Sequence, residues 1–142
     1  MAWRAYDYSS RLHRASKKTF YRPLLDVEVS SGGGAETFTA LIDSGSEVTV
    51  MSVDVALLLN ISPVGKRRVT VGSFAANKPG FISQVKIVVP EFPKEFLVTN
   101  VIFSEDVSDG VPYDILLGQE DFFRRFLVRF EKHQNKFFLS LP

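Results

Sequence analysis

The sequence contains no cysteine and only two histidines among its 142 residues. Without cysteine, the chain has no disulfide scaffold, no thiol nucleophile and no cysteine-rich zinc site. The two histidines, His13 and His133, lie far apart and belong to no recognisable ligand spacing or Ser-His-Asp arrangement. We therefore expect neither a metal ion nor another cofactor.

Long apolar runs are also missing from the chain. None approaches the roughly 18 residues that a membrane-spanning helix needs, and the first residues do not resemble the apolar core of a signal peptide. We expect a soluble, cytoplasmic protein that does not insert into membranes. With 45% hydrophobic residues, the chain is long enough to bury the core of one domain.

Charge is distributed unevenly, although the formal net charge is only +1. The first 22 residues carry six basic side chains and one acid, Asp7. We interpret residues 1–20 as a basic, flexible leader and residues 21–142 as the folded domain. A removable prosegment and an arm that packs on a partner subunit remain alternatives. Contact with nucleic acid has the least support, because no binding motif is recognisable, and none is expected.

Two segments carry the clearest chemical signal. An extended apolar run, Phe38–Ile42, leads directly into Asp43, Ser44 and Gly45, which places a carboxylate at the end of a strand on a tight turn. Because an isolated carboxylate is costly to bury, Asp43 is expected to be paired or hydrogen-bonded. Further along, the apolar triplet Ile115–Leu117 precedes Gly118, which lets the chain pass close to a neighbouring segment.

Together the two segments resemble those of the retropepsins, the single-domain aspartic protease family. The family pattern is a hydrophobic pair, Asp-Thr/Ser-Gly, a small residue and an acid, followed later by a hydrophobic triplet and Gly. The resemblance covers roughly residues 22–141. In many members an Arg after the second Gly pairs with the acid of the first motif. Here those positions hold Gln119 and Glu47, so we expect a hydrogen bond between carboxylate and amide instead.

The resemblance implies an all-β fold, a small closed barrel with one short helix after the second motif. The chain carries one Asp motif where pepsin-type enzymes carry two, so the active form is expected to be a two-fold homodimer. The sequence pattern itself predicts hairpins at residues 24–42, 68–89 and 127–139, a further strand at 48–51, and a short helix at 53–59. Phe122 and Phe126, at i, i+4 spacing, are predicted to be core residues.

The expected activity is hydrolysis of extended peptide or protein substrates, with Asp43 of each subunit activating water. The resemblance assigns supporting roles to Ser44, Gly45, Glu47, Gly118 and Gln119, and a mobile flap to the small-residue tip at residues 74–80. The expected substrate contacts are Val71, Gly72, Phe74, Ile115 and Leu116. Residues 137–139 are expected either to pair across the two-fold axis or to close the chain's own core.

Two other functional classes remain open. One is a catalytically silent retropepsin-like fold used for dimerisation or peptide binding, although Asp43, Ser44 and Gly45 are all intact. The other is a β-barrel interaction module in which the Asp-Ser-Gly turn is accidental.

Overall fold

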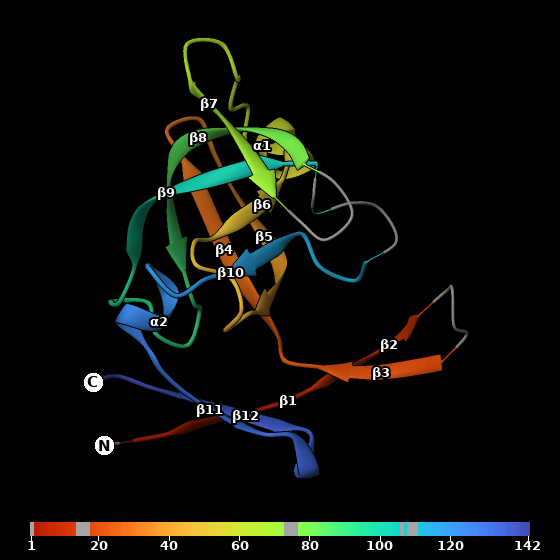
Figure 1. Cartoon of the computed structure of the whole chain (residues 1–142). Helices are drawn as coiled ribbons and strands as arrows, with labels where there is room; N and C mark the ends of the chain where they lie inside the picture. Colours follow the sequence, from red (N-terminus) through yellow and green to blue (C-terminus); the bar gives the residue numbers. More distant parts are fainter. Residues whose placement is uncertain (1, 14–17, 73–76, 106, 108–110) are drawn as a thin grey trace.

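The main body of the molecule is a closed six-stranded barrel (Figure 1). The structure is a computed structural model that describes residues 2–13, 18–72, 77–105, 107 and 111–142. Neighbouring strands follow the order β4-β5-β10-β6-β9-β8, and β8 pairs back with β4 to close the ring. The six strands are β4 (Leu24–Ser31), β5 (Gly34–Ile42), β6 (Val50–Ser52), β8 (Asn77–Val88), β9 (Leu97–Ser104) and β10 (Ile115–Leu117).

The barrel core follows from alternation along its strands. In β4, Val27 and Val29 are fully buried, whereas Asp26 and Glu28 between them are exposed. Side chains alternate between the two faces of a strand, so one face of β4 lines the core and the other meets solvent. Among the described residues, the largest fully buried side chains are those of Phe103, Phe122, Phe126 and Phe137.

A pairing between distant segments positions the two motifs. β10 runs parallel to β5, with Leu117 in register with Ile42. Each strand is therefore followed at the same end of the barrel by its motif residue, Asp43 after β5 and Gly118 after β10. This pairing brings together segments that lie far apart in the sequence.

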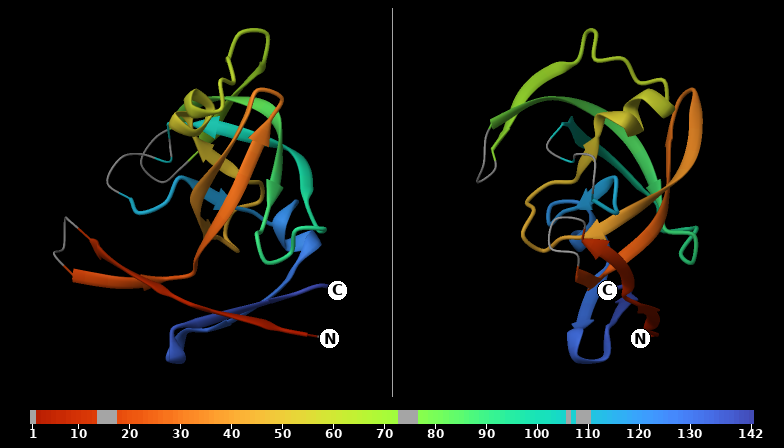
Figure 2. Two further views of the ribbon diagram at one scale, coloured as in Figure 1. Left: turned by 180° about the vertical axis from the view of Figure 1, so that it is seen from behind. Right: turned by 90° about the vertical axis from the view of Figure 1, so that its right-hand side faces the viewer.

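A three-stranded sheet lies at one end of the barrel (Figures 1 and 2). Its strand order is β1 (Arg4–Asp7), β12 (Lys136–Ser140) and β11 (Leu127–Glu131), and the 3₁₀ helix η1 (Lys132–Gln134) joins the last two. Because β12 has β1 on one side and β11 on the other, it is a central strand within a single chain. Phe137 and Leu139 are fully buried, so they close the chain's own core, the second of the two alternatives for this segment.

The strands β2 (Ser9–His13) and β3 (Lys18–Arg22) form a separate antiparallel ribbon. Figures 1 and 2 show it extending from the barrel beside the three-stranded sheet. A boundary between a leader and a domain at residue 20 stays a prediction. The structure adds that residues 4–7 are already paired with β12.

The predicted all-β barrel is confirmed, but strands β1 and β2 lie within the residues that were predicted to form a flexible leader, and several element boundaries differ. The helix after the second motif is α2 (Phe122–Arg125), and the predicted helix near residue 53 is α1 (Val53–Leu58). Residues 77–80, predicted to belong to a turn, instead lie in β8, because they continue its pairing with β7 (Arg67–Gly72). Within the described ranges, no helix has the length and apolar character to cross a membrane.

Candidate active site

Asp43 lies on a tight turn at the end of β5. Its main-chain N–H donates to the carbonyl oxygen of Leu117 at 3.1 Å, which joins the turn to β10. One carboxylate oxygen of Asp43 accepts a hydrogen bond of 2.9 Å from the N–H of Gly45. The residue is half-buried, so Asp43 keeps part of its surface open to solvent. The expectation that Asp43 is hydrogen-bonded is therefore confirmed.

Gly45 and Gly118 both allow close approach. A Cβ at Gly45 would lie 3.2 Å from a carboxylate oxygen of Asp43. A Cβ at Gly118 would lie 2.4 Å from the carbonyl carbon of Val48, closer than real Cβ atoms come to backbone. The second motif therefore needs glycine because it passes directly against the chain that follows the first.

The two motif loops are held together mainly through backbone. The N–H groups of Gln119 and Glu120 donate to the carbonyl oxygens of Ser46 and Glu47, at 2.9 and 2.8 Å. The side-chain amide of Gln119 donates to the carbonyl oxygen of Ser44 at 2.7 Å. It thus joins the loops, but not through the Glu47 carboxylate as expected, since Glu47 takes part through its main chain while its side chain is exposed.

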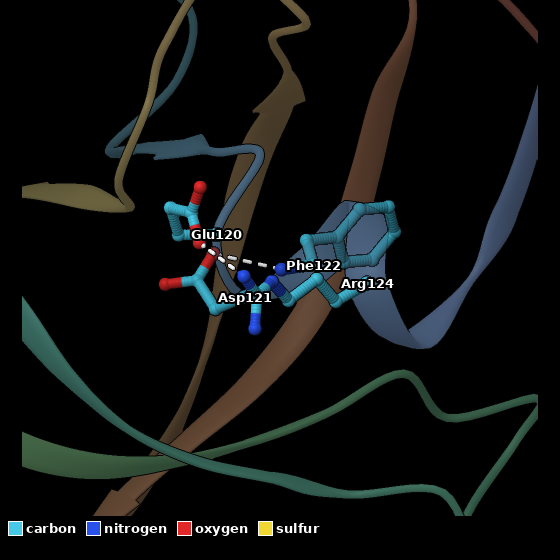
Figure 3. A network of polar contacts seen from close by, with 4 residues as sticks. All are labelled: Glu120, Asp121, Phe122 and Arg124. Carbon is cyan, nitrogen blue, oxygen red and sulfur yellow. Dashed lines mark hydrogen bonds and ion pairs between the residues drawn. The ribbon is translucent and has the colours of Figure 1, made fainter.

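A buried hydroxyl links the motif loops to α2. The Thr49 side chain donates to Asp121 at 2.5 Å and accepts a hydrogen bond of 3.2 Å from the N–H of Gly118. The same Asp121 oxygen caps α2 by accepting from the N–H of Phe122 at 2.7 Å (Figure 3). Glu120 and Arg124 form an ion pair of 2.9 Å on the solvent side of this turn. Thr49 and Asp121 were not predicted from the sequence, although a threonine within the apolar run Val48–Met51 is a signal of a buried hydrogen bond.

Tyr113 is a further polar neighbour of Asp43 that the sequence did not single out, and Arg22 is a charged neighbour of Tyr113. Burial raises the pKa of the Tyr113 phenol; the charge of Arg22 lowers this pKa, while that of Asp43 raises it further. Both charged groups therefore lie within electrostatic reach of the phenol. Tyr113 is half-buried, and its neutral O–H can serve as a hydrogen-bond donor near the carboxylate.

The residues predicted to contact substrate differ in their position and in their exposure to solvent. Val71 and Gly72 lie at the end of β7, where they pair with Lys78 and Asn77 of β8. Leu116 is half-buried on β10, whereas Ile115 is fully buried in the barrel core. Phe74 lies outside the described residues. The Ser44 hydroxyl is exposed, and within the described part of the chain it has no hydrogen-bond partner.

Comparison with solved structures identifies a match to the crystal structure of a retropepsin-like aspartic protease from Rickettsia conorii. The match covers 98% of this chain and 99% of that one, with a TM-score of 0.63. This chain has a retropepsin-like fold. Sequence identity to the Rickettsia protein is only 11%, so this structural similarity establishes the fold of the chain and not its activity. No family model and no curated protein matches the sequence.

The described residues contain no cluster of metal-binding side chains. Among the residues that the structure describes, no three His, Cys, Asp or Glu side chains are grouped so that they could hold an ion. Described polar groups near the Asp43 turn include the Tyr113 phenol, within electrostatic reach of the Asp43 carboxylate, the Gln119 amide, bonded to the main chain of Ser44, and the exposed Ser44 hydroxyl. These groups suit the binding and polarisation of water and peptide carbonyls.

Proposed function

We propose that the protein is an aspartic endopeptidase whose active form is a homodimer, with one Asp43 from each subunit. The observation that carries this proposal is the half-exposed Asp43 carboxylate, fixed by the Gly45 N–H at the end of β5 in a retropepsin-like fold. One chain supplies a single carboxylate of this kind. Two copies facing each other across a two-fold axis would supply the pair that peptide hydrolysis requires.

Two such carboxylates provide both an acid and a base. Like charges a few Å apart cannot both ionise, so the pair holds one proton, as is established for aspartic protease dyads. The ionised Asp43 takes a proton from the attacking water, and the protonated Asp43 donates its proton to the carbonyl oxygen of the scissile bond. The exposed Ser44 hydroxyl has no partner among the described residues of its own chain, so it is available to hydrogen-bond the backbone of the partner copy.

The proposed substrate is a polypeptide segment in extended conformation. Its backbone would lie between β10 and the β7–β8 hairpin, with Leu116 and Val71 contacting its side chains. Both residues are apolar and half-buried, so we expect large apolar residues on either side of the scissile bond. Gly72 and Phe74 complete the proposed contacts at the hairpin, and Ile115 would support Leu116 from the core.

The test is to map cleavages in a peptide library by mass spectrometry, at pH values between about 4 and 7. We expect the parent protein to cleave between apolar residues, and Asp43→Asn to lose cleavage by at least about 10³-fold, because the amide cannot act as base. The matched control is Asp54→Asn, which changes an exposed acid on α1 and should retain activity.

The outcome of this test also separates the other functional classes. A folded dimer without cleavage that depends on Asp43 would indicate the catalytically silent fold. A monomer whose properties are unchanged by Asp43→Asn would indicate an interaction module with an accidental motif.

A further inference from the structure

An open groove of about 630 Å³ lies beside α2, separate from the Asp43 turn. One wall is the start of β9, residues 97–99, and the other is α2 with Arg124 and Arg125. Figures 1 and 2 both show α2 next to this end of β9. Leu141 and Pro142 contribute apolar surface from the end of the chain.

The wall formed by β9 is an open strand edge. On one side β9 pairs with β8 along its whole length, but on the other side β6 covers only Ile102–Ser104. The N–H of Ile102 donates to the carbonyl oxygen of Thr49 on that second side. Main-chain groups of alternate residues in a strand point to the same edge, so those of Val98 and Asn100 also face this side. Within the described ranges, neither residue has a main-chain partner there.

We propose that this groove binds an extended peptide segment, which adds as a strand to the free edge of β9. An open strand edge forms hydrogen bonds with the main-chain N–H and C=O groups of another segment. In a folded domain these groups are already paired internally, whereas in an extended segment they are free to bind. The proposal rests on the proposed proteolysis in one respect, namely that the segment belongs to a protein substrate. The groove would then bind a part of the substrate that is remote from the bond that is cleaved.

The side chains around the groove define the kind of segment. Val98 is 55% exposed and Leu141 is half-buried, so alternate apolar side chains of the segment have surface to contact. Four charged side chains of the walls form ion pairs, Arg125 with Glu95 at 3.4 Å and Arg124 with Glu120 at 2.9 Å, and the Asp121 carboxylate accepts hydrogen bonds from Thr49 and the Phe122 N–H. We therefore expect uncharged segments to be preferred over strongly charged ones.

A single extended chain also fits the groove better than a second copy of this protein. The other described strands with an open edge are β1, β11, β7, β2 and β3, and each is paired along its opposite edge, so it would bring a folded neighbour with it. A groove enclosed by α2 on one side and β9 on the other accommodates one strand without such neighbours.

The first measurement is hydrogen exchange in the Asp43→Asn protein, which binds without hydrolysing. The probe is reduced and alkylated α-lactalbumin, an unfolded polypeptide. At saturating probe, we expect exchange of the Val98 amide to slow by at least about tenfold, because that N–H becomes a hydrogen-bond donor to the segment. This readout needs no substitution in β9, so it does not depend on the folding of a variant.

The second measurement compares Val98→Pro with Val98→Ala in the Asp43→Asn background. Proline removes the N–H that faces the groove, and it is tolerated where that group makes no ladder bond. We expect Val98→Pro to weaken probe binding by about tenfold and Val98→Ala to change it by less than about twofold, measured by fluorescence anisotropy.

Three results would overturn the proposal. The first is a hydrogen-exchange rate of the Val98 amide that the probe does not change, and the second is equal probe affinity of the two Val98 variants. The third is slower exchange of the Val98 amide as the protein concentration rises in the absence of probe. The last would assign the edge to a second copy. Failure of the proposed proteolysis has a different signature, the absence of Asp43-dependent cleavage of short peptides. A peptide too short to reach from the Asp43 turn to the groove is hydrolysed without help from the groove, so its cleavage tests the proposed proteolysis alone.

Discussion

At the scale of single residues, the candidate site depends on how closely two loops pass each other. Gly118 touches the backbone of Val48, and its N–H is bonded to the buried hydroxyl of Thr49. The Val48 atoms belong to the backbone, and the Thr49 hydroxyl is held in turn by Asp121. Neither neighbour can move aside easily, so the position of the second motif beside the loop that follows Asp43 tolerates little change in side-chain volume.

A substitution at Gly118 tests this conclusion. In Gly118→Ala, the new methyl group would lie 2.4 Å from the carbonyl carbon of Val48, so the two loops must separate. We expect the free energy of unfolding to fall by about 2–3 kcal/mol or more, measured by urea denaturation. Gly33→Ala is the matched control, because nothing lies within 4 Å of its new Cβ, and it should change stability by less than about 0.5 kcal/mol. Equal losses in the two variants would show that the loops can move apart without cost.

At the scale of secondary-structure elements, the three-stranded sheet joins the two ends of the described chain to the core. The Phe137 ring of β12 stacks on Tyr6 of β1, with ring centroids 4.9 Å apart and planes inclined by 7°. On the opposite face, Phe138 is half-buried and lies under the guanidinium of Arg129 at 4.1 Å. The two neighbouring phenylalanines of β12 thus have different surroundings.

We expect the two positions to differ in their contribution to stability. Phe137→Ala removes a fully buried ring and should cost about 3–5 kcal/mol. Phe138→Ala removes a half-buried ring and one cation–π contact, and should cost about 1–2 kcal/mol. Thermal denaturation of both variants, followed by circular dichroism, measures the difference. A larger loss for Phe138→Ala would mean that the outer face of β12 is buried in the folded protein, for example against a second copy.

Elements with a local signature could be predicted from the sequence. The β4–β5 hairpin follows from alternation around a Gly-rich turn, and α1 follows from the cap at Ser52, whose side chain accepts the Asp54 N–H. The pairing of β1 with β12 could not be foreseen, because β1 is mostly exposed and shows no strong pattern. It depends on contacts between residues at opposite ends of the chain.

In the candidate site too, residues with a local sequence signature could be predicted, whereas contacts between distant segments could not. Asp43, Gly45 and Gly118 are recognisable because each is required by local geometry: the end of a strand, a tight turn and a close passage. The nearness of Tyr113 to Asp43 depends on how the chain enters β10, which no local pattern encodes. Likewise, the Gln119 amide bonds a main-chain carbonyl, and a sequence comparison that matches side chains does not reveal such a partner.

At the scale of the whole molecule, the proposed chemistry requires two chains. In a mixture of parent and Asp43→Asn subunits, only dimers of two parent chains would carry a complete dyad. With random assortment and a ninefold excess of Asp43→Asn, activity per parent subunit should fall to roughly one tenth. The measurement is the rate of peptide cleavage after the two proteins have been mixed and equilibrated, with an equal mass of an unrelated protein as control. Activity that is unaffected by the variant would mean that one chain is sufficient.

Because the barrel closes without β7, the stability of the barrel does not depend on the length of the β7–β8 hairpin. β7 and β4 share one edge of β8, β7 along residues 77–82 and β4 along residues 86–88. The ring is complete without β7, so shortening or extending this strand leaves every link between the six barrel strands in place. Changes of length in a surface segment of this kind have small effects on folding. Over evolutionary time, the hairpin expected to cover a peptide can therefore change in length and sequence while the barrel stays the same. Related chains can in this way acquire new substrate preferences without first acquiring a more stable fold.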